Sequence, residues 1–183
     1  LTQIAQLEIK LGNYDKAGKN IDDAIKVLED KRKDDLHVAK YIHAIETQAR
    51  LYGIKGMFDE AEANLKESKR RIKKADVLIE DELSTAAELS TVLIQLGKYS
   101  DTDRLLTELI SQNEALFGTT SIRLIEPLVN RAKIQLARGE YTEAEKTAQR
   151  ANQLAVKTYT ENSTKTALTQ RILSDIYYTL GDY

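Results

Sequence analysis

Apolar residues recur along this chain three and four positions apart, in long segments separated by short polar turns, which is the spacing of amphipathic helices. One Pro and eight Gly in 183 residues are too few for a loop-rich sandwich, so the pattern indicates an all-α protein. Pro127 lies early in one segment and would bend the helix if it stood beyond the first turn. The spacing predicts helices over 1–11, 14–32, 36–54, 58–75, 80–96, 100–116, 122–138, 142–158 and 163–180.

Five short motifs repeat along the chain, each built on one glycine: Gly12, Gly56, Gly97, Gly139 and Gly181. By subtraction the glycines are 44, 41, 42 and 42 residues apart, a steadiness that indicates a repeat array. A glycine suits the positive φ of a turn that ends a helix. An aromatic residue follows two positions later, and after it come residues that we expect to cap the next helix: Asp15, Asp59, Ser100 and Thr142. Each motif therefore predicts a tight turn between two helices.

The residues around each glycine also repeat in size. The seventh residue before it is always small, namely Ala5, Ala49, Ser90, Ala132 and Ser174. The fifth residue before it is always apolar, namely Leu7, Leu51, Val92, Ile134 and Ile176. Small residues let two helices approach closely and apolar residues fill the contact, so these positions predict closely packed helix pairs.

This set of small, Gly, aromatic and Ala positions resembles the tetratricopeptide repeat (TPR). The period of about 42 exceeds the usual 34 residues and is similar to the longer repeats of kinesin light chains and bacterial multi-repeat proteins. The resemblance implies a right-handed α-solenoid, a superhelix of stacked antiparallel helix pairs. Its repeats would form a single domain over 1–33, 34–77, 78–119, 120–161 and a partial 162–183. Because both ends fall inside a helix or a motif, we expect this sequence to be an excerpt of a longer chain.

The resemblance further implies a ligand site in a concave groove, lined by the first helix of each pair at positions six, ten and thirteen residues before each glycine. The polar candidates are His43, Glu46, Arg50, Ser84, Thr91, Glu126, Lys133, Arg171 and Asp175. This polar groove of both charges suits a peptide or a helix of another protein better than an apolar small molecule. Repeats that bind chaperone C-termini carry a Lys and Asn pair at the ten-before and six-before positions. No such pair occurs here, so we expect no chaperone-tail binding.

The sequence offers no constellation for catalysis, cofactor binding or metal binding. His37 and His43 lie six residues apart on one predicted helix, which puts them on nearly opposite sides. The glycines stand singly, without the cluster of a phosphate loop, and there is no Cys. Carboxylate runs such as 78–83 match no catalytic motif. We therefore expect no enzymatic activity within this segment and no cofactor.

Charge gives little reason to expect nucleic acid or membrane as a partner. With 27 basic and 29 acidic residues the net charge is −2, so no long-range field attracts a polyanion. The basic stretch comprises Lys66, Lys69, Arg70, Arg71, Lys73 and Lys74, with a second run at 31–33. Cations near helix C-termini complement the helix dipole, so we favour a solvated outer face over a basic edge for an acidic partner or nucleic acid.

No apolar run is long enough to span a membrane, and the first residues lack the layout of a signal peptide. We expect a cytoplasmic protein. A chain without Cys fits an exported protein equally well, and the sequon at 162–164 would then be a glycosylation site.

The function that this fold implies is a protein-interaction scaffold that binds a peptide or protein segment in its groove. One alternative is the regulatory or sensor part of a larger enzyme, such as a protease or an ATPase. Another is a peptide-sensing receptor. Neither the partner nor the oligomeric state follows from the sequence.

Overall fold

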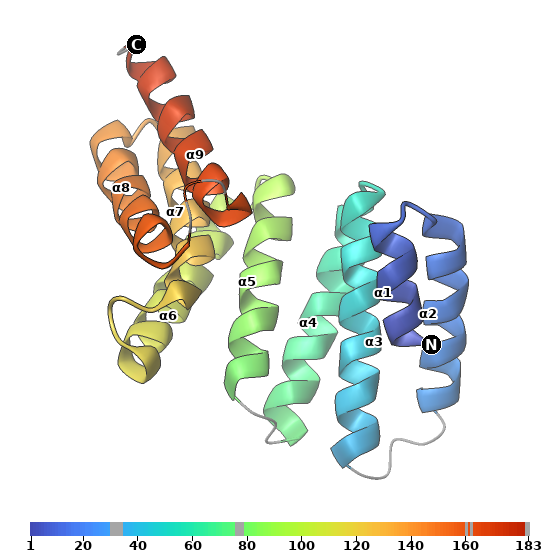
Figure 1. Ribbon diagram of the computed structural model, residues 1–183. Coiled ribbons are helices and arrows are strands. Elements are labelled where there is room, and N and C mark those ends of the chain that lie inside the picture. Colours follow the sequence, from blue (N-terminus) through green and yellow to red (C-terminus); the bar gives the residue numbers. More distant parts are fainter. Residues whose placement is uncertain (30–34, 76–78, 160, 162, 182–183) are drawn as a thin grey trace. The chain divides into compact units, whose positions relative to one another are not determined.

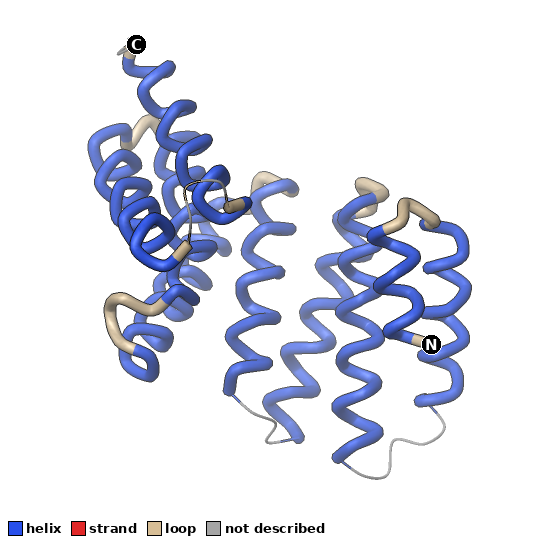
Figure 2. The backbone as a smooth tube through the Cα atoms, viewed as in Figure 1, coloured by secondary structure: helices blue, strands red, loops and turns tan. Residues whose placement is uncertain are grey.

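A computed structural model of the protein describes residues 1–29, 35–75, 79–159, 161 and 163–181. In these residues it is all-α, with nine α-helices, a single 3₁₀ helix and no strand (Figures 1 and 2). The elements are α1 (Thr2–Lys10), α2 (Tyr14–Glu29), α3 (Asp35–Ile54), α4 (Phe58–Ala75), α5 (Ile79–Gln95), α6 (Tyr99–Phe117), η1 (Ile122–Leu124), α7 (Ile125–Ala137), α8 (Tyr141–Thr158) and α9 (Thr164–Leu180). Every predicted helix is present, and the predicted end of the second helix lies outside the described residues.

The motif glycines form the turns that the sequence predicts. All five have positive φ, between 68° and 78°. The expected capping residues are wrong by two positions, because each second helix begins on the aromatic residue itself and the residue before it is the N-cap. Lys98 and Glu140 are the N-cap residues of α6 and α8, and neither side chain makes a capping hydrogen bond. Asp15 and Asp59 lie in the first turn instead, where a carboxylate complements the helix dipole.

Pro127 lies in the first turn of one helix. The helix predicted over 122–138 begins as η1 and continues as α7, in which Pro127 is the third residue. A residue in the first turn needs no hydrogen bond from its backbone nitrogen, so proline is tolerated there.

The small positions of the motif are where the helices meet. Ala5, Ala49, Ser90 and Ala132 are at most 1% exposed, as the repeat pattern predicts. Two motif residues, in the first and last copies, are not buried as predicted. Ser174 at the small position is exposed, and Leu7 at the apolar position is 59% exposed. No described helix packs over the side of α1 or α9 on which they lie.

The helices divide into two compact units, residues 1–96 with α1 to α5 and residues 97–183 with α6 to α9. In unit 1 each helix packs on the next, and α1 also contacts α3. In unit 2 the same arrangement holds, with α7 contacting α9. Contacts between alternate helices bring the first helices of neighbouring repeats together, so that their predicted lining positions can meet across the repeats.

Candidate functional site

In unit 1 the predicted lining residue His43 joins α3 to α1. The Gln6 amide nitrogen donates to His43 Nε2 at 3.0 Å and to Thr47 Oγ1 at 3.4 Å. Thr47 in turn donates to the backbone oxygen of His43 at 2.8 Å. His43 itself is exposed, so its ring lies at the surface with one nitrogen engaged by Gln6.

Glu46 is drawn into the packing of three helices. Its Oε1 accepts hydrogen bonds from Ser68 Oγ of α4 at 2.6 Å and from Thr85 Oγ1 of α5 at 2.5 Å. Ser68 and Thr85 are at most 1% exposed, and Glu46 is half-buried. A carboxylate held by two buried hydroxyl donors stabilises the helix packing, which is a role that the sequence did not assign to Glu46.

Farther along α3 the lining positions become more open. Arg50 forms an ion pair with Glu88 of α5, and its side chain is 48% exposed. Ser84 is exposed, and Thr91 Oγ1 donates to the backbone oxygen of Ala87 at 3.3 Å. Of the unit 1 candidates, His43, Arg50 and Ser84 are exposed, whereas Glu46 and Thr91 are half-buried.

Unit 2 brings four predicted lining residues of α7 and α9 into one electrostatic group. Glu126 accepts from Lys165 Nζ at 3.4 Å. Lys133 is half-buried, whereas Arg171 and Asp175 are exposed. Burial lowers the pKa of Lys133, and the Arg171 guanidinium lowers it further, against the opposing attraction of Glu126 and Asp175. The family resemblance implies that these residues line one face, and the charges of Arg171, Glu126 and Asp175 all act on the pKa of Lys133.

Several partners of the lining residues were missed by the sequence analysis. Thr47 and Glu88 stand nine residues before their glycines, whereas only positions six, ten and thirteen were considered. A polar residue at the nine-before position is the signal that would have found them. Lys165 stands sixteen residues before its glycine, where the preceding repeats have Lys40, Asp81 and Arg123, so a charged residue at that position is a second signal.

The basic stretch on α4 is partly paired with carboxylates of its own helix. Lys66 pairs with Glu62 at 2.7 Å, and Glu67 pairs with Arg70 at 2.8 Å and with Arg71 at 2.5 Å. The hydrogen bond from Arg70, with a further one from Arg71, lowers the pKa of Glu67 to about 2. The side chains of Lys73 and Lys74 and the run at 31–33 lie outside the description. Three of the described cations are thus paired within α4, and the absence of a nucleic-acid partner stays a prediction.

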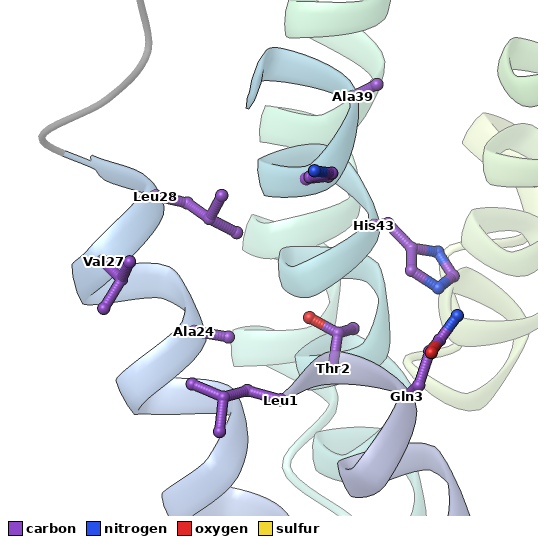
Figure 3. A pocket seen from close by; sticks show the side chains of 9 residues that line it. Leu1, Thr2, Gln3, Ala24, Val27, Leu28, Ala39 and His43 are labelled. Atoms are coloured by element: carbon purple, nitrogen blue, oxygen red, sulfur yellow. The ribbon is translucent and has the colours of Figure 1, made fainter. Parts of the chain in front are cut away.

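A cavity of about 580 Å³ lies among α1, α2 and α3 of unit 1 (Figure 3). Its wall is mostly apolar, with Leu28 of α2 and the polar His43 of α3 at its sides. In the next repeat the residue equivalent to Leu28 is Ile72, which is 1% exposed. Its neighbour Arg71 stacks on Tyr41, with the guanidinium carbon 4.6 Å from the centre of the ring. The cavity is lined by Leu1, Thr2, Gln3, Ala24, Val27, Leu28, Ala39, Lys40 and His43.

The described residues contain no group of three or more His, Cys, Asp or Glu placed to hold a metal ion. In the same part of the chain, no helix has the length and hydrophobicity needed to cross a membrane.

No family model and no curated protein matches this sequence. Solved structures do match. The structure of BtubC (BKLC) from P. vanneervenii aligns with a TM-score of 0.80 at 19% identity, over 97% of this chain and 70% of that one. A protein from Podosopora anserina, described as a putative kinesin light chain with nearly identical TPR-like repeats, aligns with a TM-score of 0.76 at 16% identity, over 98% of this chain and 85% of that one. A substituted form of the same protein gives a TM-score of 0.77 at 16% identity, over 98% of this chain and 84% of that one.

The chain has a TPR-type repeat fold. At these identities the likeness extends to the arrangement of the helices and not to the side chains on them. In TPR-type terms α1, α3, α5, α7 and α9 are the first helices of their repeats, and α2, α4, α6 and α8 are the second helices. All the lining candidates therefore lie on first helices, and the basic stretch lies on a second helix.

Proposed function

We propose that this chain is a protein-interaction scaffold that binds a peptide or protein segment across the lining residues of its first helices. The observation that carries the proposal is a row of charged and polar side chains that meet between neighbouring first helices within each unit. In unit 1 this row includes His43 and Arg50, and in unit 2 a separate row includes Glu126, Lys133 and Arg171. These residues lie outside the small and aliphatic packing of the helix pairs.

The chemistry of this row favours a polypeptide ligand. An extended segment offers backbone donors and acceptors along its length as well as side chains of both charges, and it can use a row of separate polar contacts. A drug-sized apolar molecule needs an enclosed apolar pocket instead. Exposed charges of both signs give modest and salt-sensitive affinity, so we expect binding to weaken as ionic strength rises.

A selection from a random peptide display library against the whole chain tests this proposal. Individual selected peptides are then titrated against Arg50→Ala and Lys133→Ala, with matched exposed cations on second helices, Arg104→Ala and Lys157→Ala, as controls. Truncation of a contact residue weakens binding by about 1 kcal/mol or more at a minority of interface positions, so we expect at least one lining variant to lose about fivefold or more.

The controls remove the same charge from the opposite class of helix and should leave the affinity unchanged. Equal affinity of all four variants for every selected peptide would contradict binding at the lining residues. Failure to select any peptide over a blank surface would contradict the proposed function itself.

A further inference from the structure

One side of α1 carries a stripe of exposed apolar side chains. Leu1, Ile4, Leu7 and Leu11 are 54%, 50%, 59% and 73% exposed. Successive residues of a helix are rotated by about 100°, so these four side chains lie within about one third of the helix circumference. No described helix covers these four residues, which we call the α1 stripe.

The α1 stripe occupies positions that contact a helix in the later repeats. The residues equivalent to Leu7 are at most 9% exposed, namely Leu51, Val92, Ile134 and Ile176. Leu51 packs on the preceding second helix, α2, where its Cδ2 lies 3.7 Å from the position that a Cβ would take on Gly18. Ile176 belongs to the same core cluster as Ala144 of the preceding second helix, α8. The α1 stripe is therefore a face suited to packing against a helix.

The residues beside this face indicate which kind of helix fits. In α3 and α7 the residues eight and one before the glycine bond to aspartates of the preceding second helix. These bonds run from Gln48 to Asp22 at 2.8 Å, from Lys55 to Asp15 at 3.4 Å, from Arg131 to Asp103 at 3.6 Å and from Arg138 to Asp103 at 3.3 Å. In α1 the same two positions are Ile4 and Leu11. A helix with aspartates there would find no donor, so the matching occupant is a helix whose own stripe is apolar.

We infer that the α1 stripe is the contact of a symmetric dimer, in which α1 of a second copy packs on it in antiparallel orientation. The stripe advances by steps of three, three and four residues, and almost the same steps recur when it is followed backwards. An antiparallel copy therefore places Leu1 against Leu11 and Ile4 against Leu7. Such a contact pairs the same patch on both copies, as a two-fold interface requires. It goes beyond the proposed function and uses none of the lining candidates.

The charged side chains of α1 favour the antiparallel orientation. In this register Lys10 of one copy lies opposite Gln3 of the other, so like charges are not opposed. Glu8 accepts from Asn13 Nδ2 at 2.7 Å within its own copy and needs no partner from the second. A parallel pair would place Lys10 opposite Lys10 and Glu8 opposite Glu8, which like-charge repulsion disfavours.

The apolar surface continues beyond α1. Leu1 also lines the cavity among α1, α2 and α3, together with Val27, which is 52% exposed (Figure 3). Leu11 of the second copy would lie at this end of the contact. Two short helices bury less than the roughly 800 Å² per partner of a standard interface, so the dimer should be weak. We expect a dissociation constant on the order of 10–100 µM.

Sedimentation velocity of the whole chain, over concentrations on both sides of that range, tests the dimer. We expect the dimer fraction to rise with concentration and Leu7→Glu to weaken association about tenfold or more, because it places a charge in an apolar contact. The matched control Val156→Glu changes a 44% exposed residue of α8 and should leave association unchanged. Both positions are exposed, so both variants should fold, and thermal denaturation verifies this.

A chain that is monomeric at every concentration would overturn the inference, even if the α1 stripe bound a helix of another protein. A dimer that Leu7→Glu leaves intact would overturn it as well. Neither result touches the proposed function, because Leu7→Glu alters no lining candidate and should bind the selected peptides like wild type.

Crosslinking tests the orientation, since the chain has no Cys of its own. The single variants Gln3→Cys and Lys10→Cys are treated with a short bis-maleimide, each alone and as a mixture. We expect the product that joins position 3 to position 10 to form faster than either self-linked product. Self-linked Lys10→Cys as the main product would contradict the antiparallel contact.

Discussion

Glu46 and Lys133 show that two polar residues at lining positions can have opposite environments. The Glu46 carboxylate accepts from two buried hydroxyl groups, whereas the Lys133 ammonium has no hydrogen-bonding partner among the described residues. A satisfied buried charge stabilises the packing around it, and an unsatisfied one is costly. Glu46 therefore contributes mainly to the stability of unit 1, whereas Lys133 makes no such contribution.

Removal of the Glu46 carboxylate should destabilise unit 1. In Glu46→Ala the hydroxyls of Ser68 and Thr85 lose a buried acceptor, which costs about 1–3 kcal/mol of unfolding free energy. Urea denaturation measures the loss. The matched change Glu60→Ala removes an exposed carboxylate and should cost less than about 0.5 kcal/mol. Equal stability of the two variants would contradict a packing role for Glu46.

The pKa of Lys133 gives a second prediction. Because this pKa is lowered by folding, the unfolded chain binds more protons in the window below the ordinary lysine value of 10.5. The charged Lys133 thus costs the folded state free energy at neutral pH, and this cost falls as the pH rises through the lowered pKa.

Lys133→Gln lacks this cost at every pH. We expect its stability relative to wild type to be greatest near neutral pH and to shrink on alkaline titration. Denaturation of both proteins between neutral pH and the ordinary lysine pKa of 10.5 measures this difference. A difference that grows with pH would mean that the Lys133 pKa is raised instead of lowered.

At the scale of elements, the turns depend on the backbone of the motif glycines. Gly56 has φ of +75° and open space where a side chain would project, so its substitution would be opposed by backbone strain and not by a clash. A residue with a side chain in the left-handed region costs roughly 1–2 kcal/mol. Gly53, three residues earlier in α3, also has open space but no positive φ.

These two glycines form a matched pair. Gly56→Ala should lower the unfolding free energy by about 1 kcal/mol or more. Gly53→Ala should leave it unchanged or raise it by up to about 1 kcal/mol, because alanine is the better helix former. Thermal or urea denaturation of both variants gives the comparison. Equal effects of the same sign would show that the positive φ does not limit the choice of residue at 56.

The sequence predicts these elements well because one physical constraint recurs in every copy. A glycine that must adopt positive φ marks each turn, and small residues such as Ala49 and Ala132 mark each close contact. Pairings across repeats are harder to predict, because they depend on how one first helix is offset from the next. The bonds of Arg50 to Glu88 and of Glu46 to Thr85 were missed for that reason.

Residue type also predicts the first residue of each helix only approximately. Asp15 is a good capping residue by type, but the helix begins one residue earlier, on Tyr14. Residue preference places a helix start to within a turn, and the turn geometry after the glycine decides the position.

For the whole molecule, the similarity to BtubC and to the Podosopora anserina protein extends to the fold alone. The ligand has to be inferred from this chain's own residues. Within each compact unit the lining residues lie on first helices and the basic stretch on a second helix. The central claim is that a polypeptide binds on the first-helix side.

Site-specific photo-crosslinking tests that claim most directly. A benzoyl-phenylalanine replaces one exposed residue at a time, Ser84 or Arg171 on first helices and Arg104 or Lys157 on second helices, and a selected peptide is added before irradiation. We expect crosslinks from Ser84, Arg171 or both, competed by unlabelled peptide, and none above background from Arg104 and Lys157. Competed crosslinks from the second-helix positions alone would contradict the claim.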